Sequence, residues 1–567
     1  MKMKERNAQL KNVLGAMASV ERVKEVASIP NEDTVNRQGY AAYSIADELR
    51  LLSMLNTLKI QDQYYRSENE ILVELRDLIE KIGLKDPYFL AQAIVYSRCC
   101  GEGMRAINQL AATLAAPFVA GQPWAKAFYG LWDKKKKQGG CIYRVDDMEA
   151  IKDAYAALNS SPLSNAMKKG FANALITLDT YQLAKYKDAA IDLANLVHPN
   201  SALSKAVITV NGNKMKTLDA LMQGITVTAD TWEAAQSEAG QEIAKAVKEG
   251  KITKEEAEVV LAEAKNDNWE SLLLDGKLGI LAALRNIRNM LKNPRKEVID
   301  ALCKLVQNGD KIRNGLIMPY QMDLAYMIIE DEFGSCEYGD QIKVALRNGY
   351  ETALPNLKIL LGGKTCVMID TSGSMSTACT MGNTRTGGKR ISRSAMSEAA
   401  LIGATIAKAV NGDVILFSTS AKEFKYRASD NVFAIAKQIE KGAMWGGTAI
   451  GSGFELITRL RKTYDRIFVL SDNECNTKSY YYSDWVSGAY KRYVHDVCSP
   501  YVYCVDLASY GTTILPQTNK IGYYFGYGYS MFDDVAKLEF NPSAHIDKVR
   551  KIVIDPNYIP ENIKQSA

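Results

Sequence analysis

The chain has 567 residues, more than a single hydrophobic core normally serves, so at least two domains are expected. A composition of 47% hydrophobic and 24% charged residues excludes a disordered chain, and a net charge of only +5 means that any nucleic-acid surface must come from local clustering. Three histidines, and ten cysteines without a Cys-x-x-Cys pair, argue against a zinc site and favour reduced thiols. Because no apolar run is long enough to span a membrane and the start is poor for a signal peptide, the sequence predicts a soluble protein of the cytoplasm.

Residues 1–355 are expected to form a helical domain. Apolar residues recur at helical spacing, for example at Ile45, Leu49, Leu52 and Leu55. Strand-like sequence is scarce, and the segment 206–213 (AVITVNGN) is the one candidate hairpin. Many amphipathic helices without intervening strands favour an α-solenoid or a helical bundle.

Residues 356–540 show a different pattern, in which short apolar strands alternate with helices. The strand candidates are TCVMID, DVILFS, RIFVLSD and YVYCVDL, and this alternation predicts a doubly wound, mostly parallel α/β sheet. The polar segment 376–390 is expected to interrupt this domain as a long loop. Residues 541–567 are too few to form a core and are expected to dock on an earlier domain.

Three polar motifs lie where strands of this sheet are expected to end. Asp370, Ser372 and Ser374 follow the first strand, Thr448 precedes a helix, and Asp472 follows a later strand. Because ligands bind at the carboxyl ends of the strands in such sheets, these side chains are expected to meet there. Carboxylates and hydroxyls form an all-oxygen site that suits a hard divalent cation, and Mg²⁺ is the expected ion.

The order D-x-S-x-S, Thr, Asp resembles the metal-ion-dependent adhesion site (MIDAS) of von Willebrand factor A (vWA) domains. The resemblance implies that Ser372, Ser374 and Thr448 coordinate the metal directly, while Asp370 and Asp472 hold ligands or waters around it. It also implies an open coordination position for a carboxylate from a partner. The alternative interpretation, an ordinary Asp/Ser turn, would explain the first motif alone but not all three together.

The segment 362–365 (GGKT) is reminiscent of a phosphate-binding P-loop but lacks its features. A P-loop needs a glycine at position 358, where this chain has Lys358, and it follows a strand, whereas this segment precedes one. Nucleotide binding is therefore not expected at this segment.

Several blocks of the first 355 residues resemble the TROVE domain of the Ro autoantigen family. The matching blocks are Asn36 with Gly39-Tyr40, Asp86–Leu90 with Tyr96–Arg98 and Met104-Arg105, Leu183–Lys187 with Asp192 and His198-Pro199, and Trp269-Glu270 with Leu284–Met290. Together with the vWA-like half, the resemblance covers nearly the whole chain in the order of that family.

The resemblance implies a monomeric ring of HEAT-like helical repeats joined to the vWA domain. It further implies binding of small non-coding RNA, both the 3′ ends of misfolded RNAs and Y-like RNAs, and a protein ligand or ribonuclease at the vWA domain. Lys185, Lys187 and His198 fall on or beside the family's RNA-contacting positions. The loop after Lys187 is shorter than in the family and Asn195 stands where Arg is common, so the match favours RNA binding in general over the Y-RNA mode.

Other clusters could serve an RNA surface or could simply be solvated. The basic candidates are Lys168-Lys169, Arg285 with Arg288, Lys134–Lys137 and Arg295-Lys296. Arg285 and Arg288 are spaced i, i+3, so they are expected to project from one face of a helix toward a phosphate. Two groups of tyrosines, at 480–482 and 523–529, are suited to base stacking or to packing, and the sequence assigns them no role.

The leading interpretation is a non-enzymatic RNA-binding scaffold or chaperone in ribonucleoprotein quality control. An alternative is a vWA-type, metal-dependent protein-interaction module whose helical half has no RNA role. A metal-dependent phosphodiesterase is the third, but two carboxylates are fewer than a two-metal site needs, and the chain shows no nucleophile–base set.

Overall fold

The computed structural model describes most of residues 22–57, 65–100, 105–225, 269–357, 362–383, 390–525 and 544–558, with isolated positions between 251 and 267 and at 535 and 539. The chain divides into two compact units, each described by itself below. The sheet unit comprises Met1–Leu72 with Leu357–Ile546, and the helical unit comprises Val73–Asn356 with Asp547–Ala567. None of the described helices is long and apolar enough to cross a membrane.

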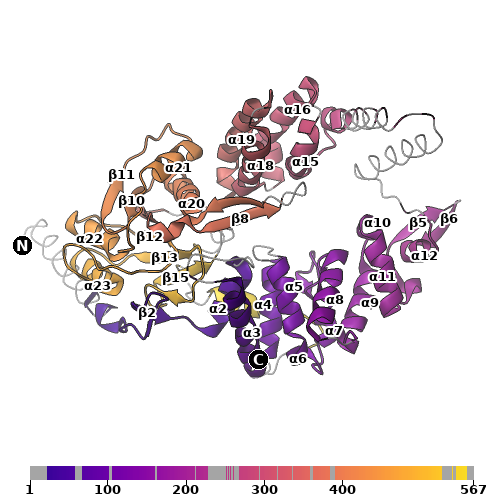
Figure 1. Ribbon diagram of the computed structural model, residues 1–567, viewed down its shortest axis with the longest axis horizontal. Helices are drawn as coiled ribbons and strands as arrows, with labels where there is room; N and C mark the ends of the chain where they lie inside the picture. The colour runs from indigo at the N-terminus through magenta and orange to yellow at the C-terminus, as the bar shows by residue number, and fades with distance from the viewer. Residues whose placement is uncertain are drawn as a thin grey trace, which may run out of the picture. The chain divides into compact units, whose positions relative to one another are not determined.

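The helical unit is built from short helices that pack side by side (Figure 1). Asp86 and Ser164 begin two of them, because each side chain accepts a hydrogen bond from a backbone N–H of the first turn. The helices are α3 (Glu68–Lys85), α4 (Pro87–Cys99), α5 (Ala106–Leu114), α6 (Ala116–Val119), α7 (Ala125–Phe128), α8 (Val145–Asn159), α9 (Asn165–Thr177), α10 (Thr180–Lys185), α11 (Lys187–Val197), α12 (Thr217–Met222), α15 (Ile280–Lys292), α16 (Lys296–Val306), α17 (Gly309–Asn314), α18 (Pro319–Phe333) and α19 (Gly339–Ala353).

Two small hairpins interrupt the helices in the part of this unit that the structure describes. Strands β5 (Val207–Val210) and β6 (Asn213–Lys216) pair antiparallel across a turn in which Gly212 has φ +80°, so the hairpin predicted from AVITVNGN is confirmed. Strands β3 (Trp132–Asp133) and β4 (Gln138–Gly139) form the second hairpin, with the four-lysine run at its turn.

The end of the chain returns to the helical unit. Helix α25 (Ala544–Arg550) leads into residues whose backbone accepts hydrogen bonds from Gln92, through Arg550 O at 2.7 Å and Ile552 O at 2.8 Å. Gly139 N donates to Val553 O at 2.9 Å, and Arg550 pairs with Asp86 at 3.0 Å. Residues 547–558 are thus held by α4, its N-cap residue and the β3–β4 hairpin.

The sheet unit contains a six-stranded sheet in the order β11-β10-β7-β12-β13-β15. Only the edge pair β10–β11 is antiparallel, so the predicted parallel sheet is confirmed. Its strands are β7 (Thr365–Asp370), β10 (Asp413–Phe417), β11 (Ala421–Phe424), β12 (Arg466–Ser471), β13 (Tyr501–Asp506) and β15 (Ile521–Phe525), and its helices are α20 (Ala395–Val410), α21 (Val432–Lys441), α22 (Gly451–Arg459) and α23 (Val486–Asp496).

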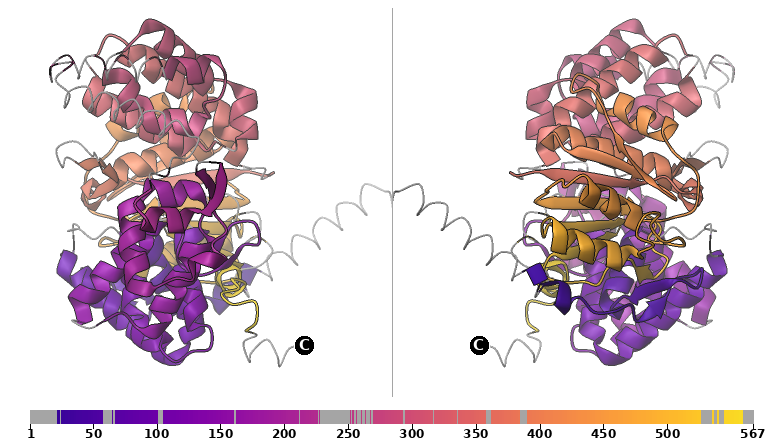
Figure 2. Two further views of the ribbon diagram at one scale, coloured as in Figure 1. Left: turned by 90° about the vertical axis from the view of Figure 1, so that its right-hand side faces the viewer. Right: turned by 90° about the vertical axis from the view of Figure 1, so that its left-hand side faces the viewer.

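Helices cover both faces of this sheet (Figures 1 and 2). Successive residues of β7 point to opposite faces, as the pleat requires. A Cβ atom built on Gly403 of α20 would lie 2.4 Å from Ile369, and one built on Gly453 of α22 would lie 2.8 Å from Met368. Glycines at these two positions let both helices approach the sheet closely, and the predicted doubly wound arrangement is confirmed.

The segment 376–390 is not wholly the long loop expected from its polar composition. Ala378–Asn383 (β8) and Arg390–Ser394 (β9) pair antiparallel, with a register shift between Thr380 and Gly382. The prediction was wrong there because a hairpin satisfies its backbone groups internally and needs no apolar pattern of its own. Residues 384–389, between the two strands, lie outside the described residues.

The first residues of the chain belong to the sheet unit, although the sequence placed them in a helical domain of residues 1–355. Helix α2 (Asp47–Thr57) buries Leu52 and Leu55 completely. Strand β2 (Ala41–Ser44) pairs with β1 (Thr34–Val35) and with β14 (Thr512–Thr513). Arg50 donates to Ser509 O at 2.7 Å. Helical periodicity predicts that one face of a helix is buried, but it does not predict which other segment covers that face. The unit to which α2 belongs could therefore not be predicted from the sequence.

Candidate metal centre and basic surfaces

The loop after β7 gathers three of the predicted metal-site residues. Asp370 is the last residue of the strand, and its Oδ1 accepts from Ser372 N at 2.9 Å. The chain then turns into a short 3₁₀ helix (Gly373–Ser376) that brings Ser372 Oγ within 3.2 Å of Ser374 Oγ. All three residues are buried, so their oxygens face one another within the protein.

The loop after β12 lies beside the first, because β12 and β7 are neighbouring parallel strands. Ser471 Oγ donates to Asp370 Oδ2 at 2.6 Å and so fixes the carboxylate. Asp472 Oδ1 accepts from Glu474 N at 3.2 Å. Asp472 Oδ2 is buried with no hydrogen-bond partner among the described residues, which is uncommon for a carboxylate oxygen and marks it as a candidate ligand.

Thr448 reaches the same edge on a third loop, which ends at the start of α22. Gly373 N donates to Gly446 O at 3.0 Å, joining this loop to the one after β7. A Cβ on Gly446 would lie 2.8 Å from Ser418 Oγ, which accepts from Gly446 N, so the close approach needs glycine. Thr448 N donates to Asn476 Oδ1 at 2.7 Å, which ties the third loop to the one after β12.

Negative charge is concentrated at this edge. Burial raises the pKa of Asp370 to about 6, although hydrogen bonds from Ser471 and Ser372 oppose the shift. Burial and the charge of Asp370 raise the pKa of Asp472 well above its ordinary value, and Glu474 acts in the same direction. A bound cation would offset both the cost of burying these carboxylates and the repulsion between them, so the donor set fits a hard divalent ion.

The donor set is mixed rather than purely acidic. No group of three or more His, Cys, Asp or Glu side chains with metal-binding geometry occurs in the described part of the chain. The other candidate ligands at this site are the hydroxyls of Ser and Thr. Ser471 and Asn476 were not assigned a role from the sequence. Ser471 could have been suspected from its place at a strand end, but Asn476 acts through Thr448, which only the folded loops bring near.

The predicted RNA-binding residues of the central block lie around α10 and α11. Lys185, in the last turn of α10, is exposed and donates to Tyr181 OH at 2.9 Å. Lys187 is exposed at the start of α11, and His198 follows its other end in a left-handed conformation with φ +48°. His198 lies eleven positions after Lys187, about 16 Å along the helix axis, so His198 does not share one cluster with the lysines.

The remaining predicted RNA-binding residues occupy α9 and α15. Lys168 is half-buried and Lys169 exposed on α9, which packs against α11. Arg285 is exposed on α15, but Arg288 pairs with Glu332 of α18 at 2.5 Å. The two arginines are therefore not equivalent, because an intramolecular carboxylate already neutralises Arg288.

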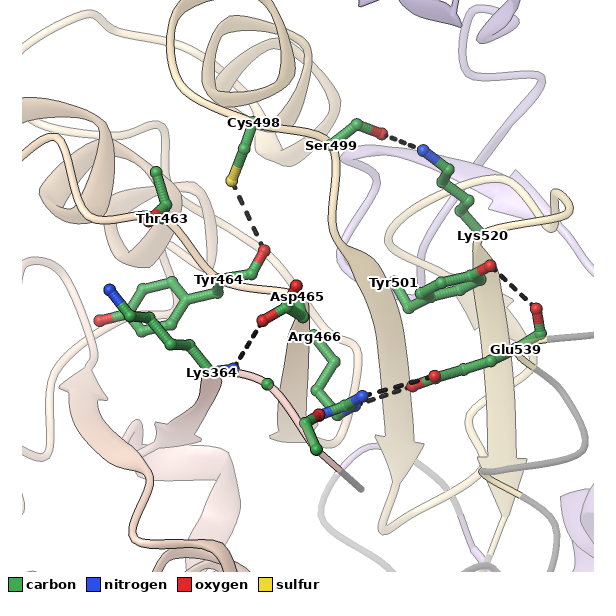
Figure 3. Close-up of a pocket in the computed structure, with 12 residues that line it drawn as sticks. Lys364, Thr463, Tyr464, Asp465, Arg466, Cys498, Ser499, Tyr501, Lys520 and Glu539 are labelled. Carbon is green, nitrogen blue, oxygen red and sulfur yellow. Dashed lines mark hydrogen bonds and ion pairs between the residues drawn. The ribbon is translucent and has the colours of Figure 1, made fainter. Parts of the chain in front are cut away.

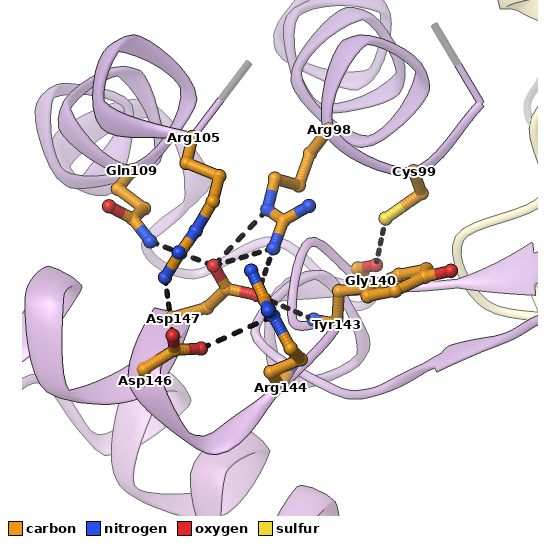
Figure 4. A network of polar contacts seen from close by, with 9 residues as sticks. All are labelled: Arg98, Cys99, Arg105, Gln109, Gly140, Tyr143, Arg144, Asp146 and Asp147. Carbon is orange, nitrogen blue, oxygen red and sulfur yellow. Dashed lines mark hydrogen bonds and ion pairs between the residues drawn. The ribbon is translucent and has the colours of Figure 1, made fainter. Parts of the chain in front are cut away.

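The four-lysine run is an ordered hairpin turn rather than a loose loop. Asp133 Oδ1 accepts from the backbone N–H groups of Lys135 and Lys136, and Lys134 Nζ lies 4.3 Å from the centre of the Tyr143 ring. Beside it, Asp147 is buried and accepts from Arg98, Gln109 and the backbone N–H groups of Tyr143 and Arg144 (Figure 4). This network fixes the base of the hairpin, so the turn that carries the four lysines has a defined conformation.

A pocket of about 750 Å³ lies at the other end of β7, next to the GGKT segment (Figure 3). Lys364 N donates to Asp465 Oδ2 at 2.6 Å, so this amide is directed at a carboxylate and not toward a phosphate. Arg466 forms an ion pair with Glu539, with Nε 2.8 Å from Oε1. These contacts agree with the expectation that the segment does not act as a P-loop.

No protein-family model matches the sequence, and no curated protein matches it. Among solved structures, the Ro (RSR) protein of Deinococcus radiodurans aligns over 89% of this chain and 100% of its own, with a TM-score of 0.50 and 14% sequence identity. The chain has the fold of a Ro protein. The predicted combination of a helical part with a doubly wound α/β part is thereby confirmed.

Within this Ro fold, the first sequence block has an unexpected neighbour. Asn36 Nδ2 donates to Cys475 O at 2.7 Å, and Asn476 Nδ2 donates to Gln38 Oε1 at 3.1 Å. Asn476 is also the residue that holds Thr448. The opening block therefore supports a loop of the candidate metal centre.

Proposed function

We propose that the protein is a non-enzymatic RNA-binding scaffold of the Ro type, acting in the cytoplasm in quality control of small non-coding RNA. Its ligands are the 3′ ends of misfolded RNAs and Y-like RNAs. The observation that carries the proposal is the Ro fold over 89% of the chain. The exposed lysines of α9, α10 and α11 support it, because structured RNA is bound largely through its phosphates and its shape.

The sheet unit is proposed to bind Mg²⁺ as a MIDAS. Ser372, Ser374 and Thr448 would coordinate the ion, with Asp370 and Asp472 balancing its charge. When bound, the ion supplies a positive centre with an open position for a carboxylate of a protein ligand or ribonuclease. The buried oxygen of Asp472 without a partner among the described residues supports this assignment.

Filter binding over a salt series tests the RNA role. The probe is a stem-loop RNA with a free single-stranded 3′ tail, and we expect affinity to fall steeply with salt, by about 0.7–0.9 log units per log unit of salt for each phosphate contact. The protein should leave the RNA intact in Mg²⁺. Absence of binding at low salt would overturn the proposal in favour of a metal-dependent protein-interaction module, and RNA cleavage that is lost in Asp370→Ala would overturn its non-enzymatic part.

A further inference from the structure

The structure separates the tyrosine groups that the sequence left without a role. Tyr523 and Tyr524 are each 4% exposed in β15 and belong to the interior. Tyr480, Tyr481 and Tyr482 are instead 77%, 59% and 41% exposed. Burial in the interior does not explain three consecutive exposed rings, and surface aromatic patches commonly mark binding sites.

Cations accompany these rings. The guanidinium carbon of Arg459 lies 3.7 Å from the centre of the Tyr481 ring, and that of Arg492 lies 4.3 Å from the centre of the Tyr482 ring. Tyr480 meets Tyr481 edge-on, with ring centres 5.2 Å apart. We call these five residues the tyrosine surface.

The backbone beneath the tyrosine surface is held in place. Ser479 N donates to Asp484 O at 2.8 Å, and Asp484 N donates back to Ser479 Oγ at 3.1 Å. Tyr482 N donates to Oε1 of the buried Glu455 at 2.6 Å. Because the loop is already ordered, a ligand that stacks on it loses little conformational entropy on binding.

We propose that the tyrosine surface binds single-stranded RNA, with bases stacking on the Tyr480 ring and on the outer face of the Arg459–Tyr481 pair. Aromatic rings and guanidinium planes both accept stacked bases, irrespective of sequence. The RNA class rests on the proposed function, and the new element is a second RNA site, in the sheet unit rather than among the lysines of the helical unit.

The local charge favours a single strand over a protein partner. Asp484 pairs with Arg492 at 2.9 Å, but neither Arg459 nor Lys478 has a carboxylate partner within the described part of the chain. Single-stranded RNA complements this surface in two ways, because each nucleotide brings a flat base that can stack on a tyrosine and a phosphate that can pair with a cation.

The tyrosine surface also lies close to the candidate metal centre. Thr477 N donates to Thr448 O at 3.1 Å, and Tyr480 follows three residues later, at most about 11 Å along an extended chain. RNA bound at the tyrosines is therefore expected to run past the loops that hold the metal ligands.

Fluorescence anisotropy with a labelled oligouridylate of about 20 nucleotides tests the proposal, since this probe is unstructured and longer than the roughly 4–16 nucleotides of comparable sites. In the full-length protein, Tyr480→Ala with Tyr481→Ala should weaken binding at least about fivefold, the smallest effect usual for losing one stacked base. The matched control, Tyr480→Phe with Tyr481→Phe, keeps the rings and should bind nearly as the wild type does. Both positions are exposed, so the variants are expected to fold as the wild type does, and thermal melting of each variant checks this.

A stem-loop RNA without a single-stranded tail separates this proposal from the proposed function. If the Ala variant loses the oligouridylate but keeps the stem-loop, the tyrosine surface is a distinct single-strand site. If the Ala variant binds the oligouridylate as the wild type does, or the wild type does not bind it at all, the tyrosine surface is not an RNA site, whatever the stem-loop does. If the wild type binds the oligouridylate but not the stem-loop, the proposed function is contradicted and the tyrosine surface remains a single-strand site.

Discussion

Replacing Asp370 with Asn should stabilise the metal-free protein while abolishing its response to Mg²⁺. Burial raises the pKa of Asp370 from 3.8 to about 6, so the folded protein holds this proton more tightly than the unfolded chain does. At pH 7 the carboxylate is ionised in both states, and about two pK units correspond to about 3 kcal/mol of lost stability. An uncharged Asn avoids this penalty and keeps an oxygen to accept from Ser372 N.

The size of the effect follows from this pKa shift. Because Asn cannot reproduce every hydrogen bond of the carboxylate, we expect a gain of about 1–3 kcal/mol, or very roughly 2–12 °C in melting temperature. The gain should be largest at pH 7 and shrink toward pH 4, because the folded wild type becomes protonated as the pH falls through about 6. In the wild type, Mg²⁺ at about 100 times its Kd should add about 2.7 kcal/mol.

Differential scanning calorimetry in EDTA and in millimolar Mg²⁺ measures both effects. The matched control is Asp465→Asn, which makes the same substitution at the opposite end of the sheet and should leave the Mg²⁺ response unchanged. A metal-free Asp370→Asn protein that melts below the wild type at pH 7, yet still gains stability from Mg²⁺, would refute the reasoning.

Three further predictions concern other residues. Removing the charges of Lys185 and Lys187 should weaken stem-loop RNA binding and lower the log–log salt slope by about one unit per lost phosphate contact, measured by filter binding; an unchanged slope would remove these lysines from the RNA site. Thr448→Ala keeps the backbone bond but loses the hydroxyl, so Mg²⁺ should raise the melting temperature less than in the wild type, and an equal shift would exclude Thr448 as a ligand. Arg98→Ala leaves Asp147 buried without its cation and should lower the free energy of unfolding by about 3–5 kcal/mol in urea titrations, whereas a loss below about 1 kcal/mol would contradict the role of the pair.

The sequence alone determined the architecture and the location of the candidate metal centre. Alternation of apolar strands with helices is local information, because a strand and a helix each bury a face with its own period. Parallel strands bring their carboxyl ends to one edge, so motifs that follow strands had to converge. The positions of Asp370, Ser372 and Asp472 directly after apolar strands were therefore enough to group them at one edge.

Only the tertiary structure decided which partner each buried face meets. Leu52 and Leu55 gave a clear helical pattern, yet the unit they pack in depends on contacts with residues more than 400 positions away, such as that between Arg50 and Ser509. Tertiary structure likewise decided which charged side chains are paired and which aromatic rings are exposed. Arg288 is neutralised by Glu332, and Tyr480 is exposed while Tyr523 is buried, because burial and ion pairing are properties of surfaces that distant segments of the chain create together.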